Sequence, residues 1–229
     1  MPCYVVRKIR RHPVKAMAGE SLAEVEVDAR GLVGDRWYAV VDGDGKLASG
    51  KHSHRFRRRD PVFGFAARTT DGGVRVSGAE GEWTVGEPDL DTALTRAMGA
   101  SVRVLAENAT PHFDDAAVSL VGTASLDWCR EHLEVDADPL RLRANLVVDT
   151  DEPFVEETWH GDLLVGDVRL APVGRTERCR MIDIAQQGLG RQEGRWLRGL
   201  SGSREMKLGI YLEVRATGVI RTGDAVRPV

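Results

Sequence analysis

The chain has 229 residues, of which 42% are hydrophobic and 29% are charged, and its formal net charge is −3. Such a composition is typical of an ordinary soluble globular protein. Because the net charge is slightly negative, we expect no global affinity for polyanions, so any anion-binding site must be a local cluster of basic residues. The length suits either one large β domain or two small intertwined ones.

The cysteine content points to a reducing compartment. Cys3, Cys129 and Cys179 are an odd number and form no CxxC pair, which argues against a disulfide scaffold and against a structural zinc site. No apolar run approaches the ~20 residues of a membrane span. The N-terminus lacks the long apolar stretch of a signal peptide. We therefore expect a cytoplasmic protein with no membrane contact.

The first third of the chain predicts strands. Short apolar-rich or alternating runs occupy residues 4–9, 22–27, 37–41, 74–76 and 82–85. Asp-Gly sequences at 42–45 and 71–73 favour hairpin turns, because these residues tolerate the positive φ of primed turns. Closely spaced strands joined by such turns predict a barrel or a sandwich.

Two helices are expected in the middle of the chain. Residues 88–98 place apolar side chains on one face between Pro88 and Gly99, which suit a helix start and a helix end. Residues 123–133 form the second helix, and Cys129 lies on its apolar side, so we expect it in the core. Residues 102–105 predict a strand and 108–115 a polar loop.

The last third returns to strands. We expect them at 142–148, 163–165, 168–173, 208–215 and 225–229, with a tight turn at Gly166-Asp167. Residues 188–193 predict a glycine-rich loop, followed by a short helix around 196–200. No internal repeat or linker separates the two halves, so we expect them to pack as one unit.

Cys179 is the strongest candidate for chemistry. It lies between Arg178 and Arg180 after a predicted strand, and guanidinium neighbours favour the thiolate over the thiol. The thiolate is the form that attacks electrophiles and binds soft metals. The alternative is a surface-loop cysteine with incidental arginines.

The densest basic cluster occupies residues 51–59. It could shape the entrance of a site for an anionic ligand, bind nucleic acid, or be a solvated loop. Phe56 is its only aromatic residue and the protein is acidic overall, so we expect no nucleic-acid partner.

Basic residues also interrupt three apolar segments. Lys15 lies in a polar turn, Arg36 follows two glycines, and Arg141, Arg143 and Asn145 would share one face of the predicted strand at 142–148. Burying such groups without partners costs several kcal/mol, so they are either exposed or face a polar ligand. Lys15, Arg36, Arg143 and Arg178 together would suit a phosphate and a polar heterocycle, because arginine pairs with phosphate bidentately.

These segments, in this order, resemble the MOSC proteins, a family named after the C-terminal domain of molybdenum cofactor sulfurase. The resemblance rests on PVKAMAGE at 13–20, RGLVGDRW at 30–37, RANLVV at 143–148, WHG at 159–161, GDV at 166–168, TERC at 176–179 and GVIRTGDAV at 218–226. Similar proteins include the mitochondrial amidoxime-reducing component and its bacterial relatives. The match covers nearly the whole chain.

The resemblance implies a mainly β fold with a few helices (α+β), in which a MOSC-type β-barrel is intertwined with an N-terminal β-barrel region. The N-terminal region would span residues 1–105, and the MOSC domain, which carries Cys179, residues 106–229. It also implies a molybdenum cofactor (molybdopterin), with Cys179 as the molybdenum ligand and catalytic residue. Phosphate and pterin contacts would fall on Lys15, Arg36, Arg143, Asn145 and Arg178. Binding of pyridoxal phosphate is a further expectation at the level of the family.

The function implied is that of an oxidoreductase that reduces N-hydroxylated or N-oxygenated small molecules. No iron–sulfur or aminotransferase-like module is evident, so electrons would come from a separate ferredoxin-, flavin- or haem-type protein. The alternative is a molybdenum cofactor carrier or a sulfur-transfer module that forms a persulfide on Cys179. Two departures from the family pattern, Ala16 in place of a serine and residues 181–188 in place of a DPxTG-like turn, concern substrate preference more than cofactor binding.

Overall fold

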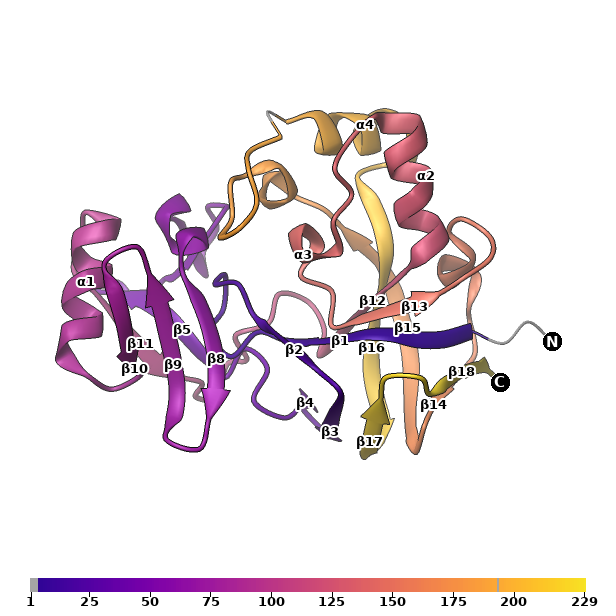
Figure 1. Ribbon diagram of the computed structural model, residues 1–229, viewed down its shortest axis with the longest axis horizontal. Helices are drawn as coiled ribbons and strands as arrows, with labels where there is room; N and C mark the ends of the chain where they lie inside the picture. Colours follow the sequence, from indigo (N-terminus) through magenta and orange to yellow (C-terminus); the bar gives the residue numbers. More distant parts are fainter. Residues whose placement is uncertain (1–3, 193) are drawn as a thin grey trace.

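The computed structural model describes residues 4–192 and 194–229. Cys3 and the end of the predicted 188–193 loop lie outside the described residues. The chain forms two lobes side by side (Figure 1): a strand-rich lobe with helix α1, drawn in purple to magenta, and a barrel that bears the remaining labelled helices.

The barrel lobe is built on an eight-stranded sheet with the order β13-β12-β16-β15-β14-β18-β1-β2. An additional pairing of β1 with β13 closes seven of these strands into a barrel and leaves β2 outside the ring. The β12–β13 pair is parallel and the other pairs are antiparallel. The strands are β1 (Tyr4–Arg11), β2 (Glu20–Leu22), β12 (Val118–Gly122), β13 (Leu146–Asp149), β14 (Leu163–Val165), β15 (Val168–Glu177), β16 (Lys207–Ala216) and β18 (Ala225–Pro228).

A small sheet with the order β17-β3-β4 lies beside the barrel. It consists of β3 (Glu24–Asp28), β4 (Gly31–Leu32) and β17 (Gly218–Arg221). The single strand predicted at 22–27 is therefore wrong in one respect. The chain bends at Ala23, because the residues before it pair with β1 and those after it pair with β17.

The other lobe has two small sheets, with the orders β11-β5-β6-β7 and β10-β9-β8. Its strands are β5 (Tyr38–Asp42), β6 (Leu47–Ser49), β7 (Phe56–Arg58), β8 (Ala66–Thr70), β9 (Gly73–Gly78), β10 (Gly81–Thr84) and β11 (Val102–Ala106), and its 3-10 helix is η1 (Asp60–Gly64). Helix α1 (Pro88–Met98) confirms the first predicted helix. Pro88 begins it, and Gly99 ends it with a φ of 65°, a conformation that glycine adopts without strain.

The remaining helices belong to the barrel lobe. They are α2 (Thr123–Leu133), α3 (Pro139–Leu142) and α4 (Arg195–Arg204), with the 3-10 helices η2 (Val155–Thr158) and η3 (Arg180–Asp183). Helix α2 confirms the second predicted helix, and Cys129 is fully buried in the cluster that joins α2, α4 and the barrel wall. Helix α4 extends the short helix expected at 196–200.

The strand predicted at 142–148 is wrong in its first half. Asp138 accepts a hydrogen bond from the backbone N–H of Leu140 (2.8 Å) and Pro139 fixes the first helical residue, so this segment forms α3. Arg143 then adopts a φ of 54°, a left-handed conformation that interrupts the extended backbone of a strand. Arg141, Arg143 and Asn145 therefore do not share a strand face.

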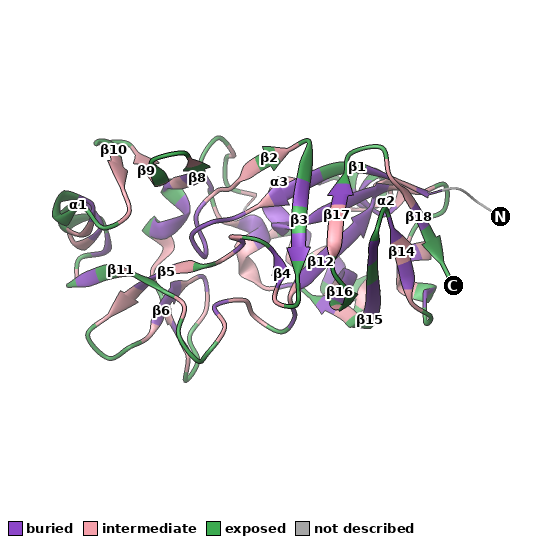
Figure 2. Cartoon of the chain, turned by 90° about the horizontal axis from the view of Figure 1, so that it is seen from below, coloured by how far each residue is buried: buried purple, intermediate pink, exposed green. Residues whose placement is uncertain are grey.

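Burial follows the strands closely (Figure 2). Every residue of β12 is buried, and β3 alternates between exposed and buried side chains. One apolar core fills the barrel, and a second lies in the other lobe around Phe63 and α1. Between these cores the cavity described below is lined by both polar and apolar residues.

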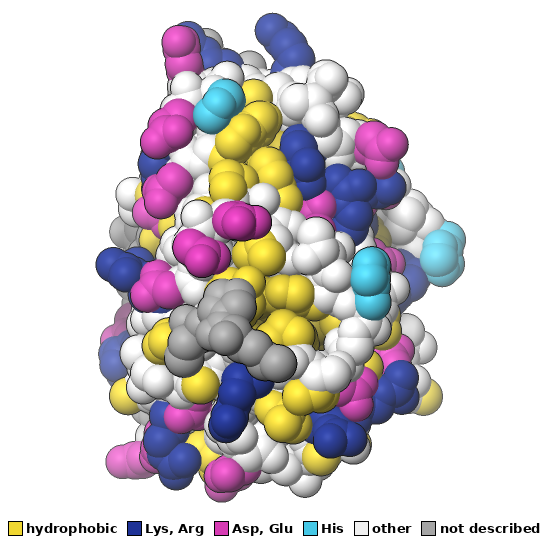
Figure 3. All heavy atoms as spheres, turned by 90° about the vertical axis from the view of Figure 1, so that its right-hand side faces the viewer, with side chains coloured by type: hydrophobic (Ala, Val, Ile, Leu, Met, Phe, Trp, Pro, Cys, Tyr) yellow, Lys and Arg dark blue, Asp and Glu magenta, His cyan; other side chains and the backbone are white. Residues whose placement is uncertain are grey.

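The end of the barrel seen in Figure 3 carries acidic and basic side chains interspersed with hydrophobic ones.

In the predicted basic cluster, Arg57 and Arg59 form ion pairs with Asp42, and Arg58 forms one with Asp60. Among the described helices, none is both long and apolar enough to cross a membrane.

Candidate functional site

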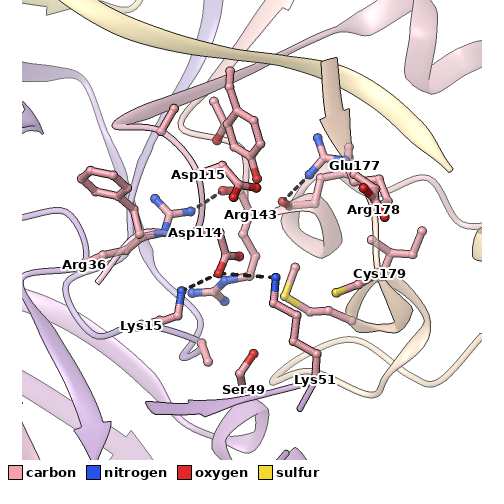
Figure 4. Close-up of a pocket in the computed structure, with 18 of the residues that line it drawn as sticks. Lys15, Arg36, Ser49, Lys51, Asp114, Asp115, Arg143, Glu177, Arg178 and Cys179 are labelled. Atoms are coloured by element: carbon pink, nitrogen blue, oxygen red, sulfur yellow. Dashed lines mark hydrogen bonds and ion pairs between the residues drawn. The ribbon is translucent and has the colours of Figure 1, made fainter. Parts of the chain in front are cut away.

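All six side chains singled out in the sequence line one cavity of about 330 Å³ (Figure 4). Lys15 and Arg36 come from the segments between β1 and β5, whereas Arg143 and Asn145 come from the turn between α3 and β13. Arg178 and Cys179 follow β15. The fold thus brings together residues that are as many as 164 positions apart in the sequence.

Lys15 is a buried cation held by a carboxylate. Its Nζ lies 3.0 Å from Oδ1 of Asp114 and 4.8 Å from the centroid of the Phe56 ring. Lys51 approaches the same carboxylate oxygen at 3.7 Å. Burial lowers the pKa of the Lys15 ammonium to about 8, against the opposing effect of Asp114. Burial by itself would raise the pKa of Asp114, but Lys15 and Lys51 outweigh it and lower that pKa to about 2.

Arg36 is fixed by three groups. Its Nη1 pairs with Asp35 and lies 3.4 Å from Oδ1 of Asn145, and its Nη2 donates to the carbonyl of Arg143 at 3.0 Å. Asp35 also accepts the backbone N–H of His12 at 2.7 Å. Arg36 has a φ of 50°, a conformation that costs energy for a residue with a Cβ. These contacts hold the guanidinium at the cavity wall.

Arg143 is the least satisfied group in the cavity. It is 4% exposed, and neither Nη1 nor Nη2 has a hydrogen-bond partner among the described residues. Burial, reinforced by the positive charge of Arg36, lowers the pKa of its guanidinium to about 9. A buried unpaired cation of this kind is costly unless a ligand supplies an anionic or polar partner.

Asn145 and Arg178 use most of their polar atoms within the protein. Asn145 Oδ1 accepts from the backbone N–H of Ser119 (3.1 Å) and from its hydroxyl (3.0 Å), and Nδ2 donates to the carbonyl of Arg10 (3.2 Å). Arg178 donates to the carbonyl of Leu208 from Nε (2.9 Å) and Nη2 (2.7 Å), and to that of Leu142 from Nη1 (3.1 Å). These two residues therefore hold the cavity walls together.

Cys179 is half-buried and directly precedes η3, at the opposite side of the cavity from Lys15 and Arg36 (Figure 4). Its two arginine neighbours differ in their roles. Arg178 points into the protein, while Arg180 forms a bidentate ion pair with Asp60 (2.7 and 2.9 Å) in the other lobe. Among residues 4–192 and 194–229, no group of three or more His, Cys, Asp or Glu side chains is arranged to hold a metal ion.

The sequence interpretation missed Asp114 and named Lys51 only as part of the entrance loop. Asp114 lies in the 108–115 loop, which has no periodic pattern, and its place beside two lysines depends on tertiary structure alone. The Asp114-Asp115 pair was the one available signal. Tyr211 also lines the cavity, and burial raises the pKa of its phenol to about 12.

The arrangement combines an anion-binding wall with a thiol. Lys15, Arg36, Lys51 and Arg143 supply positive charge, and Asp35 and Asp114 offset part of it. Such a cavity can hold a ligand that carries a phosphate-like group at one end and presents a soft or electrophilic centre to Cys179 at the other. The unpaired nitrogens of Arg143 fit the anionic part of a molybdopterin-type group, and the single thiol fits its metal.

Comparison with known proteins identifies the family of the chain. A family model described as the MOSC domain matches residues 95–227, and one described as the MOSC N-terminal beta barrel domain matches residues 3–135. The molybdenum cofactor sulfurase of Danio rerio is 25% identical over 260 residues, covering 87% of this chain and 31% of the relative. The human protein of the same name is 34% identical over 97 residues, covering 39% of this chain and 11% of the relative. The chain thus spans about a third or less of the length of these relatives.

Among solved structures, the YuaD protein of Bacillus subtilis superimposes with a TM-score of 0.55 at 14% identity, covering 98% of this chain and 94% of that chain. At this identity the likeness shows the fold alone, and it agrees with the expected mainly β architecture. The closed barrel, the ordered motifs and the family models lead to one conclusion: the chain belongs to the MOSC domain family.

Proposed function

We propose that the chain binds a molybdopterin-type molybdenum cofactor in the cavity between its lobes and reduces N-oxygenated small molecules with electrons from a separate protein. The observation that carries the proposal is Arg143, a buried guanidinium with both terminal nitrogens unpaired in a cavity that ends at the Cys179 thiol. The names of the sequence relatives support a cofactor that contains molybdenum.

Within this proposal the basic residues have two kinds of role. Lys15 and Arg143 contact the anionic groups of the ligand directly, because both border the cavity. The terminal nitrogens of Arg143 have no partner among the described residues, and Lys15 pairs with the partly exposed Asp114. Arg36, Asn145 and Arg178 act mainly by position, since protein groups already accept most of their hydrogen bonds. Arg178 fixes the segment on which Cys179 lies.

Cys179 supplies the soft donor atom. When bound, the cofactor supplies the two-electron chemistry that removes oxygen from nitrogen, and the protein supplies orientation and electrostatics. A thiolate suits molybdenum better than the oxygen donors of Asp114 or Glu177. The half-buried position of Cys179 leaves its sulfur accessible to a ligand in the cavity.

The test is expression in a host that makes molybdopterin, followed by metal analysis and an assay of amidoxime reduction with a chemical reductant. We expect about one molybdenum per chain, and we expect Cys179→Ser to lose the activity and much of the metal. Cys129→Ser is the matched control, because that thiol is buried between α2 and α4 and lines no part of this cavity. Protein that contains no molybdenum and reduces no amidoxime under these conditions would count against the proposal.

A second function, sulfur transfer, is supported by the name shared by the sequence relatives. In this case the Cys179 thiolate attacks the outer sulfur of a donor persulfide, forms a new S–S bond and releases the donor as a thiolate. Mass spectrometry after incubation with a persulfide donor separates the two functions. A stable mass increase of one sulfur on Cys179, without metal in any preparation, would favour transfer. Binding of pyridoxal phosphate stays a prediction.

A further inference from the structure

The Asp114 carboxylate occupies the centre of the cationic cavity. Figure 4 shows it between Lys15 and Lys51, with the guanidinium of Arg143 beside it. One oxygen, Oδ1, lies 3.0 Å from Nζ of Lys15 and 3.7 Å from Nζ of Lys51. Two lysines that share one carboxylate oxygen form the kind of site that a phosphate oxygen also occupies.

The carboxylate is attached to a segment without regular structure. Residues 107–117 contain no helix or strand, and the Asp114 side chain is 38% exposed, so it has an open path to solvent. Arg55 tethers this segment from the other lobe. Its guanidinium donates to the carbonyls of Pro111, Phe113 (3.3 Å) and Asp114 (3.4 Å). The part of the segment next to Asp114 is therefore held by hydrogen bonds that can exchange with water, whereas the buried His112 and Ala116 anchor it on either side.

The charges of the cavity do not balance with Asp114 in place. Asp35 pairs with Arg36, and Asp114 pairs with Lys15 and Lys51, while the terminal nitrogens of Arg143 form no hydrogen bond to any described carboxylate. With Arg178 the cavity and its wall carry five cationic side chains against the carboxylates of Asp35, Asp114, Asp115 and Glu177. A dianion in the position of the Asp114 carboxylate would neutralise more of this charge than a single carboxylate does. The same position cannot hold both groups without strong repulsion between like charges.

We propose that Asp114 is an intramolecular occupant of an anion subsite formed by Lys15 and Lys51, and that a phosphate group enters by displacing it and loosening the part of residues 107–117 that carries it. This inference deepens the proposed function, because the phosphate of the cofactor would be the displacing group. It is testable without molybdenum, since inorganic phosphate carries the same chemistry.

Calorimetric titration of the purified full chain with inorganic phosphate tests the exchange. We expect Asp114→Asn to bind phosphate at least about fivefold more tightly, because contacts between a carboxylate and two ammonium groups no longer have to be broken. Unchanged or weaker binding by this variant would overturn the inference.

Arg55 separates displacement from simple charge repulsion. Arg55→Gln removes a positive charge, which alone would weaken anion binding, but it also releases the tether, which would strengthen it. We expect tighter binding. Arg57→Gln is the control, because Arg57 carries the same charge and pairs with Asp42 and Asp44 instead of the 107–117 segment. Equal weakening by both variants would mean that the tether has no role.

Hydrogen exchange gives an independent readout. Ligands usually slow the exchange of backbone amide hydrogens in the segments that they contact. Displacement predicts the opposite, namely that phosphate increases the amide exchange rate within residues 107–117. Protection or no change in that segment would contradict the displacement. If phosphate releases the segment but the chain acquires no molybdenum, the proposed function fails and this inference stands. If the chain binds molybdenum but Asp114→Asn leaves phosphate affinity unchanged, this inference fails and the proposed function stands.

Discussion

Replacing Arg143 by methionine should stabilise the protein while it weakens ligand binding. Arg143 is 4% exposed, and its two terminal nitrogens have no partner among the described residues. The pKa of about 9 for its guanidinium means that the folded state disfavours the charged form. Relative to an ordinary arginine, the difference corresponds to on the order of 5 kcal/mol, at about 1.36 kcal/mol per pKa unit.

Methionine keeps an unbranched side chain of similar length and the same strained φ, so only the charge and its hydrogen-bonding groups are lost. Replacing buried charges with apolar residues commonly gains about 1–4 kcal/mol, and we expect Arg143→Met to lie in this range. Each kcal/mol should raise Tm by about 2–4 °C in a chain of this size. Urea or thermal unfolding of the ligand-free protein measures the effect, and phosphate titration measures the accompanying loss of affinity.

Arg178→Met is the matched control, because Arg178 is equally buried but donates three hydrogen bonds to the carbonyls of Leu142 and Leu208. Its loss leaves two buried carbonyls short of donors, at a cost of about 1–3 kcal/mol each. The two substitutions should therefore shift the free energy of unfolding in opposite directions. A destabilised Arg143→Met would refute the reasoning, because it would show that the guanidinium is stabilised within the protein and is not held ready for a ligand.

Three further predictions follow from the same geometry. Lys15 has a lowered pKa of about 8, so its ammonium is lost as the pH rises through that value. The loss from Lys15 should lower phosphate affinity about fivefold between pH 8 and pH 9, and Lys15→Gln should remove this part of the pH dependence, leaving only the part due to Arg143, whose pKa is about 9. Burial raises the pKa of Cys129 to about 11, so peptide mapping after iodoacetamide treatment of the native protein at pH 8 should find this thiol unmodified and Cys179 alkylated. Asp183 accepts hydrogen bonds from the backbone N–H groups of Trp196 and Leu197 at the start of α4 (3.0 Å each). Asp183→Ala should therefore lower the free energy of unfolding, measured by urea titration, by about 1–2 kcal/mol. An unchanged urea midpoint would contradict this capping role.

The sequence predicted the elements whose patterns are local. Helices α1 and α2 were recognisable from apolar spacing, α1 also from the flanking Pro88 and Gly99, and the hairpin at Gly166 from its turn residues. The segment around Arg143 was misassigned because alternation along 141–145 suggested a strand. The N-terminal cap by Asp138 and the positive φ of Arg143 interrupt that alternation, and neither leaves a period-two signal.

The site was predictable only as an ordered set of motifs. That Lys15, Arg36, Arg143 and Cys179 line one cavity depends on the packing of two lobes, which no local pattern specifies. The sequence also could not separate residues that border the cavity with unpaired charge, such as Arg143, from those that brace its walls, such as Arg178. Both are arginines beside apolar runs, and only their hydrogen-bond partners distinguish them.

Closure of the barrel by β1 has a consequence for how the protein is made. Val5 pairs with Asp149, and Tyr4 pairs with Val226, so the first described strand meets β2 early but finds its two neighbours in the barrel, β13 and β18, only after most of the polypeptide has left the ribosome. Contacts between such distant residues slow folding, since a long loop must close before any of them forms. Until then an apolar strand edge is available to other chains, and we expect refolding yield to depend strongly on protein concentration.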